Sequence, residues 1–303
     1  MKKIISLLYF IYFNKKVRNL DYFNFHKLIT YNPNYEQDFP LKNNMLYGNF
    51  KAAITLEKQS KLSFDYYIEH GIIFSKQIGA AAYIPPRIKK IYTFSNQRAK
   101  LLQTYYPNKE IVAIGAYILN IPFFKKKSIL DKLKQKNGKT LIVFPVHSLP
   151  MVNAQFDQEN FTNEIIKVSQ NFNKTYICLH YVDILNGKSK LYENLGFEVL
   201  CAGHKLDTRF INRLKDIIYL SDHTMSNSIG THLGYSIVMN RPHYFYYQQI
   251  KTTTINNKFQ ENYENVENKE KERLSIQAKK LFTLNHIITE EHIKFIKEYW
   301  GSF

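Results

Sequence analysis

TLIVFPV, at residues 140–146, is the first of five short apolar runs that decide the fold of this chain. The other four are rich in the same β-favouring residues: 175–181 (TYICLHY), 197–202 (FEVLCA), 217–221 (IIYLS) and 243–247 (HYFYY). Continuous apolar runs of this length indicate strands that are buried on both faces. Segments with helical character lie between them: 160–172, 188–195, 207–216 and 228–237. This alternation predicts a parallel sheet with helices on both faces.

The first half of the chain is less regular, but it also predicts an α/β unit. Its expected strands are shorter: 51–56 (KAAITL), 65–69 (DYYIE), 90–94 (KIYTF) and 110–114 (EIVAI). A helix is expected at 95–105, opened by the capping residues Ser95 and Asn96. The predicted organisation has four parts: a smaller N-terminal domain (1–120), a linker (121–138), a larger domain (139–285) and a last amphipathic helix (286–303) that could pack back on the first domain.

The composition is that of an ordinary globular protein with a strong positive charge. Of 303 residues, 45% are hydrophobic and 22% are charged, so disorder is not expected. The net charge of +17 favours an anionic partner, which could be nucleic acid, a membrane surface or a nucleotide phosphate. No dense basic block and no aromatic RNA-binding motif occurs, so nucleic acid is not the expected partner.

The N-terminus, MKKIISLLYFIYFNKK, is basic and then apolar, like the front of a signal peptide. It lacks a small-residue cleavage site and is too short to span a bilayer, so it predicts a first strand or helix of the fold, which could touch the inner membrane. Two basic clusters could contact lipid headgroups: Lys15, Lys16 and Arg18, and Lys125, Lys126 and Lys127. A solvated basic surface explains each cluster equally well.

Polar residues follow the strands predicted in the second half, where ligands bind in open parallel sheets. They include four histidines expected at the same sheet edge, among the following residues: His147 and Ser148; His180; Gly203 and His204; Asp222, His223, Ser226, Asn227 and Ser228. A single histidine is more often structural, but four at one edge indicate a site.

The segment 221–242, SDHTMSNSIGTHLGYSIVMNRP, predicts a phosphate site. Hydroxyls of Ser226 and Ser228 would lie beside the free amides of the following helix, and Gly230 would permit close approach. Asn227 lies in the same loop, and the first helical turn adds a further pair of polar residues: Thr231 and His232. Helix capping by one serine is the simpler alternative, although it explains one residue and not the whole cluster.

The first half contributes IEHGIIF, in which Glu69 and His70 directly follow a predicted strand and Gly71 allows a tight turn. A carboxylate or imidazole there would face the second domain and could deprotonate an acceptor hydroxyl. The alternative is a polar turn without catalytic function.

These motifs, in this order, resemble the GT-B glycosyltransferases that build bacterial surface polysaccharides. The Glu69-His70-Gly71 turn, the Phe-Pro-x-His-Ser turn at 144–148 and the serine loop before Arg241-Pro242 are similar to motifs of bacterial polysialyltransferases and of teichoic-acid glycerophosphate polymerases. The chain differs by having His-Ser where the sialyltransferases have His-Pro, and Ser-Asn-Ser where they have Ser-Ser. The resemblance spans roughly residues 65–247.

The resemblance implies two Rossmann-like domains that face each other across a cleft, with the N-terminal one smaller. It implies that Glu69 or His70 is the catalytic base, and that a set of residues in the second domain binds the donor: His147, Ser148, Gly203, His204, His223, Ser226, Asn227, Ser228, Thr231 and His232. No acidic pair follows a strand and no His/Cys cluster has metal-ligand spacing, so neither a metal nor a cofactor is expected.

The expected function is metal-independent, inverting sugar transfer from a nucleotide-activated donor, with a CMP-sugar slightly favoured. The acceptor would be a growing capsule, lipopolysaccharide or O-antigen glycan, free or lipid-linked, and the protein would be cytoplasmic with peripheral contact to the anionic inner membrane. Two alternatives stay open: a CDP-dependent glycerophosphotransferase-like enzyme, and a non-catalytic sugar- or nucleotide-binding protein.

Overall fold

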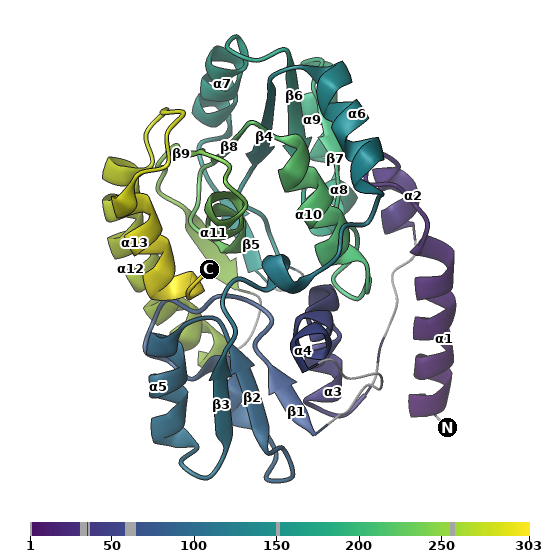
Figure 1. Ribbon diagram of the computed structural model, residues 1–303, viewed down its shortest axis with the longest axis vertical. Coiled ribbons are helices and arrows are strands. Elements are labelled where there is room, and N and C mark those ends of the chain that lie inside the picture. Colours follow the sequence, from purple (N-terminus) through teal and green to yellow (C-terminus); the bar gives the residue numbers. More distant parts are fainter. Residues whose placement is uncertain (1, 31–34, 36, 58–64, 150–151, 255–257) are drawn as a thin grey trace.

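The computed structural model describes residues 2–30, 35, 37–57, 65–149, 152–254 and 258–303. It contains two parallel sheets, the smaller from the N-terminal part of the chain and the larger from the C-terminal part (Figure 1). The α/β class with two Rossmann-like units, the smaller one first, is therefore confirmed.

The larger sheet has five parallel strands in the order β7-β6-β4-β8-β9. Their bounds are as follows: β4 (Thr140–Phe144), β6 (Lys174–Cys178), β7 (Glu198–Leu200), β8 (His223–Ser226) and β9 (His243–Phe245). Since the strand order reverses at β4, helices cover both faces and loops converge at the carboxyl ends of the central strands.

Both faces of β4 are buried, which explains its unbroken apolar sequence. Leu141 and Val143 pack on one side with residues of α7 and α9, whereas Ile142 and Phe144 pack on the other with residues of α10 and α11. The helices of this unit are these: α6 (Lys127–Asn137), α7 (Gln158–Ser169), α8 (Tyr181–Leu185), α9 (Ser189–Asn194), α10 (Phe210–Leu220) and α11 (Thr231–Val238).

The smaller sheet has three parallel strands in chain order: β1 (Tyr66–Ile68), β2 (Lys90–Thr93) and β3 (Glu110–Ala113). The remaining elements of the first half are helical: α1 (Lys2–Val17), α2 (Phe25–Ile29), α3 (Leu41–Asn44), η1 (Leu46–Gly48), α4 (Phe50–Glu57), η2 (Gly79–Tyr83), α5 (Asn96–Tyr105) and η3 (Tyr117–Asn120). Ser95 caps α5 as expected, because its hydroxyl accepts a hydrogen bond from Arg98 N at 3.2 Å.

Two predicted strands are wrong. The segment 51–56 is helix α4, in which Phe50, Ala53 and Ile54 have the spacing of one helix face, and short apolar runs are ambiguous between strand and helix. The segment 217–221 belongs mainly to helix α10, and the strand begins later, at His223. More than half of the predicted linker is helix α6, which packs against α10.

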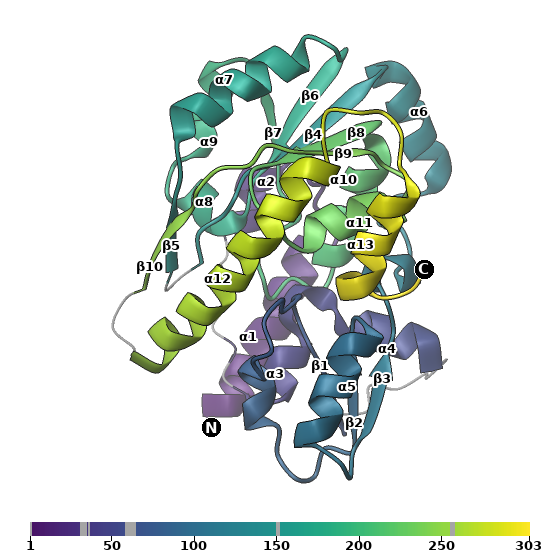
Figure 2. The same cartoon turned by 90° about the vertical axis from the view of Figure 1, so that its left-hand side faces the viewer.

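The C-terminal part connects the two units (Figure 2). A small antiparallel pair, β5 (Val152–Gln155) and β10 (Lys251–Thr254), precedes the long helix α12 (Lys258–Leu281) and the last helix α13 (Glu290–Trp300). The Glu267 carboxylate of α12 accepts hydrogen bonds from Phe74 N and Ser75 N, both at 3.0 Å. Trp300 lies against Gly234 of α11, where an added Cβ would come within 2.2 Å of the indole. The Trp300 ring centroid is also 5.5 Å from the ring centroid of Phe74.

Candidate active site

Tyr47 lies between the carboxyl ends of the two sheets. Its ring centroid is 6.4 Å from that of His70, which follows β1, and 6.4 Å from that of His180, which follows β6. Its backbone N donates to Lys205 O at 2.6 Å, which fastens η1 to the loop after β7. Tyr47 has φ +58°, an uncommon conformation for a residue with a Cβ. Such strain persists where surrounding contacts hold it, and it is frequent at functional sites.

The His70 ring has a defined tautomer because Asn43 orients it. The Asn43 side-chain nitrogen donates to Ile68 O at 2.7 Å, so its oxygen is the atom that lies 2.8 Å from His70 Nδ1. That oxygen can only accept, so Nδ1 carries the proton and Nε2 keeps its lone pair. Burial lowers the pKa of His70, although the neighbouring Glu69 charge opposes this shift. His70 is therefore a neutral imidazole whose basic nitrogen is Nε2.

His147 and His180 form a stacked pair at the carboxyl edge of the larger sheet. Their ring centroids are 4.3 Å apart with an interplanar angle of 24°. His147 is exposed, and its Nδ1 lies 3.2 Å from Ser148 O. Both ring nitrogens of His180 are shielded from solvent, and neither has a hydrogen-bond partner in the described part of the chain.

The environment of His180 keeps the ring neutral. Burial first, then repulsion from Lys205 and from His147 and His204 in their protonated forms, lower its pKa well below the usual value, and the nearby Ser148 backbone offsets this only in part. A neutral imidazole has one donor and one acceptor nitrogen, and buried polar groups normally have partners. His180 is therefore a buried imidazole whose hydrogen-bonding capacity is left largely unused by the described residues.

Several lysines surround the histidine pair. The positive charge of Lys205 lowers the pKa of His70 and of His180, and the charges of Lys271 and Lys188 lower the pKa of His147. Lys188 pairs with the buried Asp183 at 2.7 Å, and burial lowers the pKa of Lys205. The resulting field favours an anionic ligand.

The side chains of the serine loop, residues 226–228, form hydrogen bonds mainly within the loop and with neighbouring protein groups. Ser226 Oγ, which is buried, donates to Ser228 O at 3.0 Å and lies 2.9 Å from His243 Nε2. The Asn227 side chain accepts from Val146 N at 2.7 Å and donates to the Gln248 side chain at 2.9 Å. These two side chains thus hold the loop in shape and have little hydrogen-bonding capacity left for a ligand.

The helix that follows this loop begins without a side-chain cap. Gly230 is the N-cap of α11, and in the first turn, which starts at Thr231, the backbone N of Leu233 donates to Gly230 O at 3.1 Å. His232 stacks on Phe144 with centroids 5.3 Å apart, and its Nε2 lies 3.1 Å from Ser228 O. Burial and then the His147 charge lower the pKa of His232 to about 4, so it is neutral at pH 7.

Two predicted residues lie in different surroundings from those expected. The Glu69 carboxylate is buried and bonded to Arg98, with the closest pair of atoms 2.7 Å apart, and it also accepts from Thr93 Oγ1 at 2.6 Å. The placement of His223 is wrong: it begins β8 at the amino end of the sheet, where its Nε2 lies 2.8 Å from Asn285 O. The error follows from the strand assigned to 217–221, since the true strand starts where that one had ended.

Three other predicted residues have contacts within the fold. Ser148 is buried, and its Oγ accepts from Ala154 N at 3.3 Å. Gly203 has φ +116°, and an added Cβ would lie 2.7 Å from a carboxylate oxygen of Asp207. His204 is buried and accepts from Leu206 N at 3.1 Å, and burial lowers its pKa to about 3.

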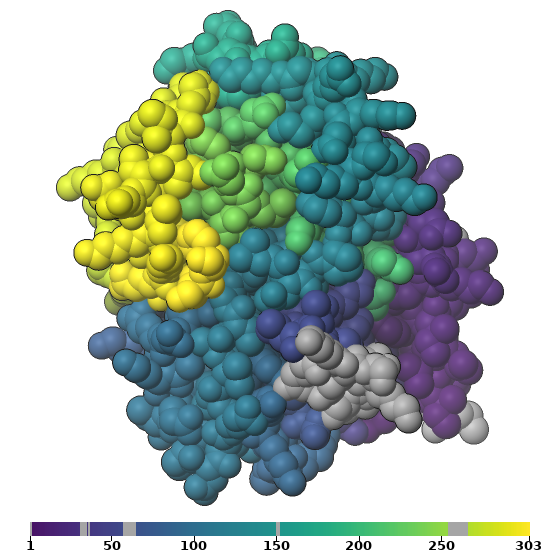
Figure 3. Space-filling view, viewed as in Figure 1, coloured from purple at the N-terminus to yellow at the C-terminus, as the bar shows by residue number. Residues whose placement is uncertain are grey.

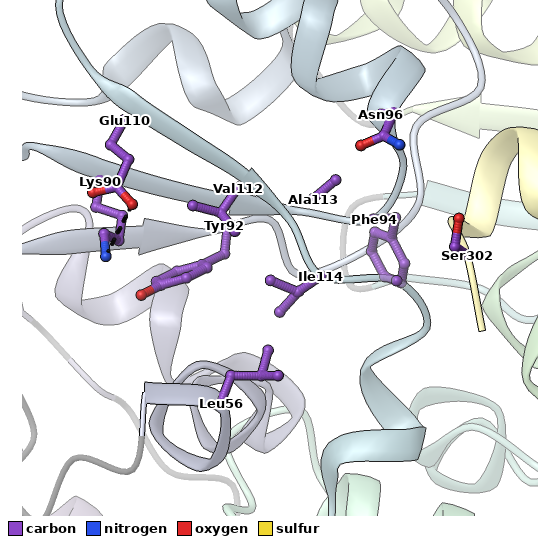
Figure 4. Close-up of a pocket in the computed structure, with 11 residues that line it drawn as sticks. Leu56, Lys90, Tyr92, Phe94, Asn96, Glu110, Val112, Ala113, Ile114 and Ser302 are labelled. Carbon is purple, nitrogen blue, oxygen red and sulfur yellow. Dashed lines mark ion pairs between the residues drawn. The ribbon is translucent and has the colours of Figure 1, made fainter.

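A cavity of about 480 Å³ lies elsewhere, along the smaller sheet (Figure 4). Tyr92, Ile114 and Leu56 line it, and none of the predicted site residues does. Its charged lining residues, Lys90 and Glu110, pair with each other at 3.2 Å. The opposite charges of these two side chains compensate each other, so this pair is poorly placed to attract a phosphate.

Sequence reasoning missed Tyr47 and Asn43. Neither follows a strand, and both come from the irregular segment before α4, so no periodicity marks them. His180 was recognised as one of the edge histidines, but nothing in its sequence shows that its nitrogens would lack partners. In the described residues, no group of three or more His, Cys, Asp or Glu side chains is placed to hold a metal ion.

Comparison with known proteins does not assign this chain to a family. No protein-family model matches the sequence, and no curated protein matches it. Among solved structures, the chain is similar to the UDP-GlcNAc 2-epimerase of Methanocaldococcus jannaschii, with a TM-score of 0.37 and 12% identity over 94% of this chain and 91% of that one. A likeness at this level identifies neither a family nor a substrate.

Proposed function

We propose that this protein is a glycosyltransferase that moves a sugar from a nucleotide-activated donor to a glycan acceptor. His70 is the general base of the proposal. His147 and His180, with the first turn of α11, bind the donor phosphate, and the surrounding lysines attract it.

The observation that carries this proposal is the orientation of His70 by Asn43. An asparagine whose amide is fixed by Ile68 O holds Nδ1–H at 2.8 Å and leaves Nε2 unprotonated. A base oriented by a third group is the arrangement that activates a hydroxyl nucleophile. Glu69 is less suited to this role, because its carboxylate is already bonded to Arg98 and Thr93.

The chemistry proposed is a direct displacement. His70 Nε2 takes the proton of the acceptor hydroxyl as that oxygen attacks the anomeric carbon, and the bond from that carbon to the donor phosphate oxygen breaks. Negative charge then develops on the leaving phosphate. Helix amides, imidazole N–H groups and lysines near the histidine pair would stabilise that charge. Attack opposite to the leaving group inverts the anomeric configuration.

The nature of the donor is the first thing to test. Purified protein would be incubated with CMP-, CDP-, UDP- and GDP-linked sugars and with CDP-glycerol, and the released nucleotide would be identified by chromatography. Release from one of the sugar donors that depends on an added glycan acceptor is the expected result. Release from CDP-glycerol alone would replace sugar transfer by glycerophosphate transfer.

Variants separate the two halves of the site. We expect His70→Ala to abolish transfer while nucleotide affinity changes less than twofold. His147→Ala should weaken nucleotide binding by roughly tenfold to a hundredfold, because hydrogen bonds to a charged group contribute about 1.5–3 kcal/mol. His26→Ala, which removes an exposed imidazole from α2, is the matched control. If His70→Ala transferred sugar at the parent rate, His70 would not be the base.

A further inference from the structure

Helix α1 has an apolar face that none of the described residues covers. Seven of its large apolar side chains are exposed to solvent, with the following exposed fractions: Ile4 (64%), Ile5 (59%), Leu7 (40%), Leu8 (61%), Tyr9 (41%), Ile11 (54%) and Tyr12 (47%). The opposite face packs on the protein through Phe10, Phe13 and Val17. A helix that is apolar on both faces but covered on only one needs a second apolar environment.

The charges around this face indicate which environment fits. Lys2 and Lys3 lie at the start of α1, Lys15 and Lys16 lie at its end, and Arg18 follows. The helix contains no acidic residue, but Lys3 forms an ion pair with Asp38. Lys125, where the second basic cluster starts, forms an ion pair with Asp21, just beyond the end of α1. An anionic bilayer offers an acyl region for the exposed Ile, Leu and Tyr side chains and charged headgroups for the basic residues that flank them.

The size and position of α1 agree with this arrangement. In the described residues, no helix has both the length and the apolarity needed to cross a membrane. Sixteen residues give α1 a length of roughly 24 Å, enough for several exposed turns to lie flat on a surface. The helix forms one flank of the molecule (Figures 1 and 3), so a flat surface can approach it.

We propose that α1 docks the protein on an anionic lipid bilayer, with its apolar side chains below the headgroups and its lysines among them. Docking would bring the candidate active site close to the bilayer, because α1 contacts the loop after β7. Asn14 of α1 accepts from Thr208 N at 2.9 Å, and Phe13 lies against His204, with ring centroids 5.8 Å apart. If the proposed function holds, the acceptor that suits this position is a lipid-linked glycan.

The test measures binding of the full chain to vesicles, without any substrate. Vesicles of phosphatidylcholine and phosphatidylglycerol should bind the protein and carry it into the pellet on sedimentation. Vesicles of pure phosphatidylcholine should bind it at least tenfold less. Ile4→Gln/Leu8→Gln/Ile11→Gln should lower the partition coefficient by roughly a hundredfold, since these side chains lose their apolar burial. The matched control, Leu185→Gln/Ile276→Gln/Ile287→Gln, changes similarly exposed residues elsewhere and should bind like the parent.

Charge is tested separately. Lys15→Gln/Lys16→Gln/Arg18→Gln should reduce binding to anionic vesicles by roughly fivefold for each charge removed. Lys190→Gln/Lys280→Gln/Lys294→Gln, at exposed positions away from α1, should have little effect. Circular dichroism and thermal unfolding would show that each variant is folded.

Three results would overturn the proposal. They are equal binding of parent and apolar variant to vesicles, equal binding to neutral and anionic vesicles, and a lipid-free dimer in sedimentation velocity that the apolar variant dissociates. The last would assign the face to a second copy of the chain. None of these results depends on His70 or on nucleotide binding, so failure here leaves the proposed function untouched.

Discussion

The histidine pair and the serine loop both follow strands of the larger sheet, yet they differ in what they can offer a ligand. In the pair, His147 is exposed and His180 has two buried nitrogens without partners in the described residues. In the loop, Ser226 and Asn227 are fully buried and bonded to protein groups. A polar residue after a strand is therefore a candidate for ligand binding only when its hydrogen-bonding groups are not already bonded to other parts of the protein.

The same contrast separates the neighbours Glu69 and His70, and Glu69→Ala should have the largest effect on stability. It would leave the Arg98 guanidinium buried without its carboxylate, which costs about 3–5 kcal/mol. Urea denaturation would measure the free energy of unfolding, with His70→Ala as the comparison at about 1 kcal/mol. A Glu69→Ala protein that is as stable as the parent but inactive would return Glu69 to the list of catalytic residues.

His180→Phe tests the pair directly. Phenylalanine keeps a ring beside His147 but removes both orphaned nitrogens, so we expect stability to be unchanged or raised by roughly 1 kcal/mol. Nucleotide affinity should fall by roughly tenfold to a hundredfold, because a hydrogen bond to a charged phosphate is lost. Calorimetry of nucleotide binding and of thermal unfolding would measure both. Lower stability with unchanged affinity would show that His180 is a structural residue like Asn227.

Asn227→Ala should lower stability and leave nucleotide affinity largely unchanged, which is the reverse of His180→Phe. We expect its effect on function to be smaller than that of His180→Phe. Its side chain bonds Val146 N and Gln248, so its loss leaves a partly buried amide unpaired and should reduce the free energy of unfolding by about 1–3 kcal/mol. Nucleotide affinity should change less than in His180→Phe. Should affinity fall more in Asn227→Ala than in His180→Phe, the comparison between the two regions would be reversed.

The errors in reading the sequence have a common cause. The segments 51–56 and 217–221 have apolar residues that suit either a strand or a helix, and only their packing decides. The second error moved His223 from the amino end of β8 to the site. His147, His180 and His204, in contrast, follow strands whose runs were unambiguous, and they lie at the carboxyl edge as expected.

By itself, the sequence determined the α/β class and the edge at which polar residues collect, because apolar periodicity and strand–helix alternation are local properties of the chain. Only the tertiary structure decided which of those residues keep free hydrogen-bonding groups. It also placed Tyr47 and Asn43 beside His70, and it left one apolar face of α1 uncovered by the described residues. The physical reason is that partners and burial depend on segments far apart in the sequence, and no local pattern records which of them will meet.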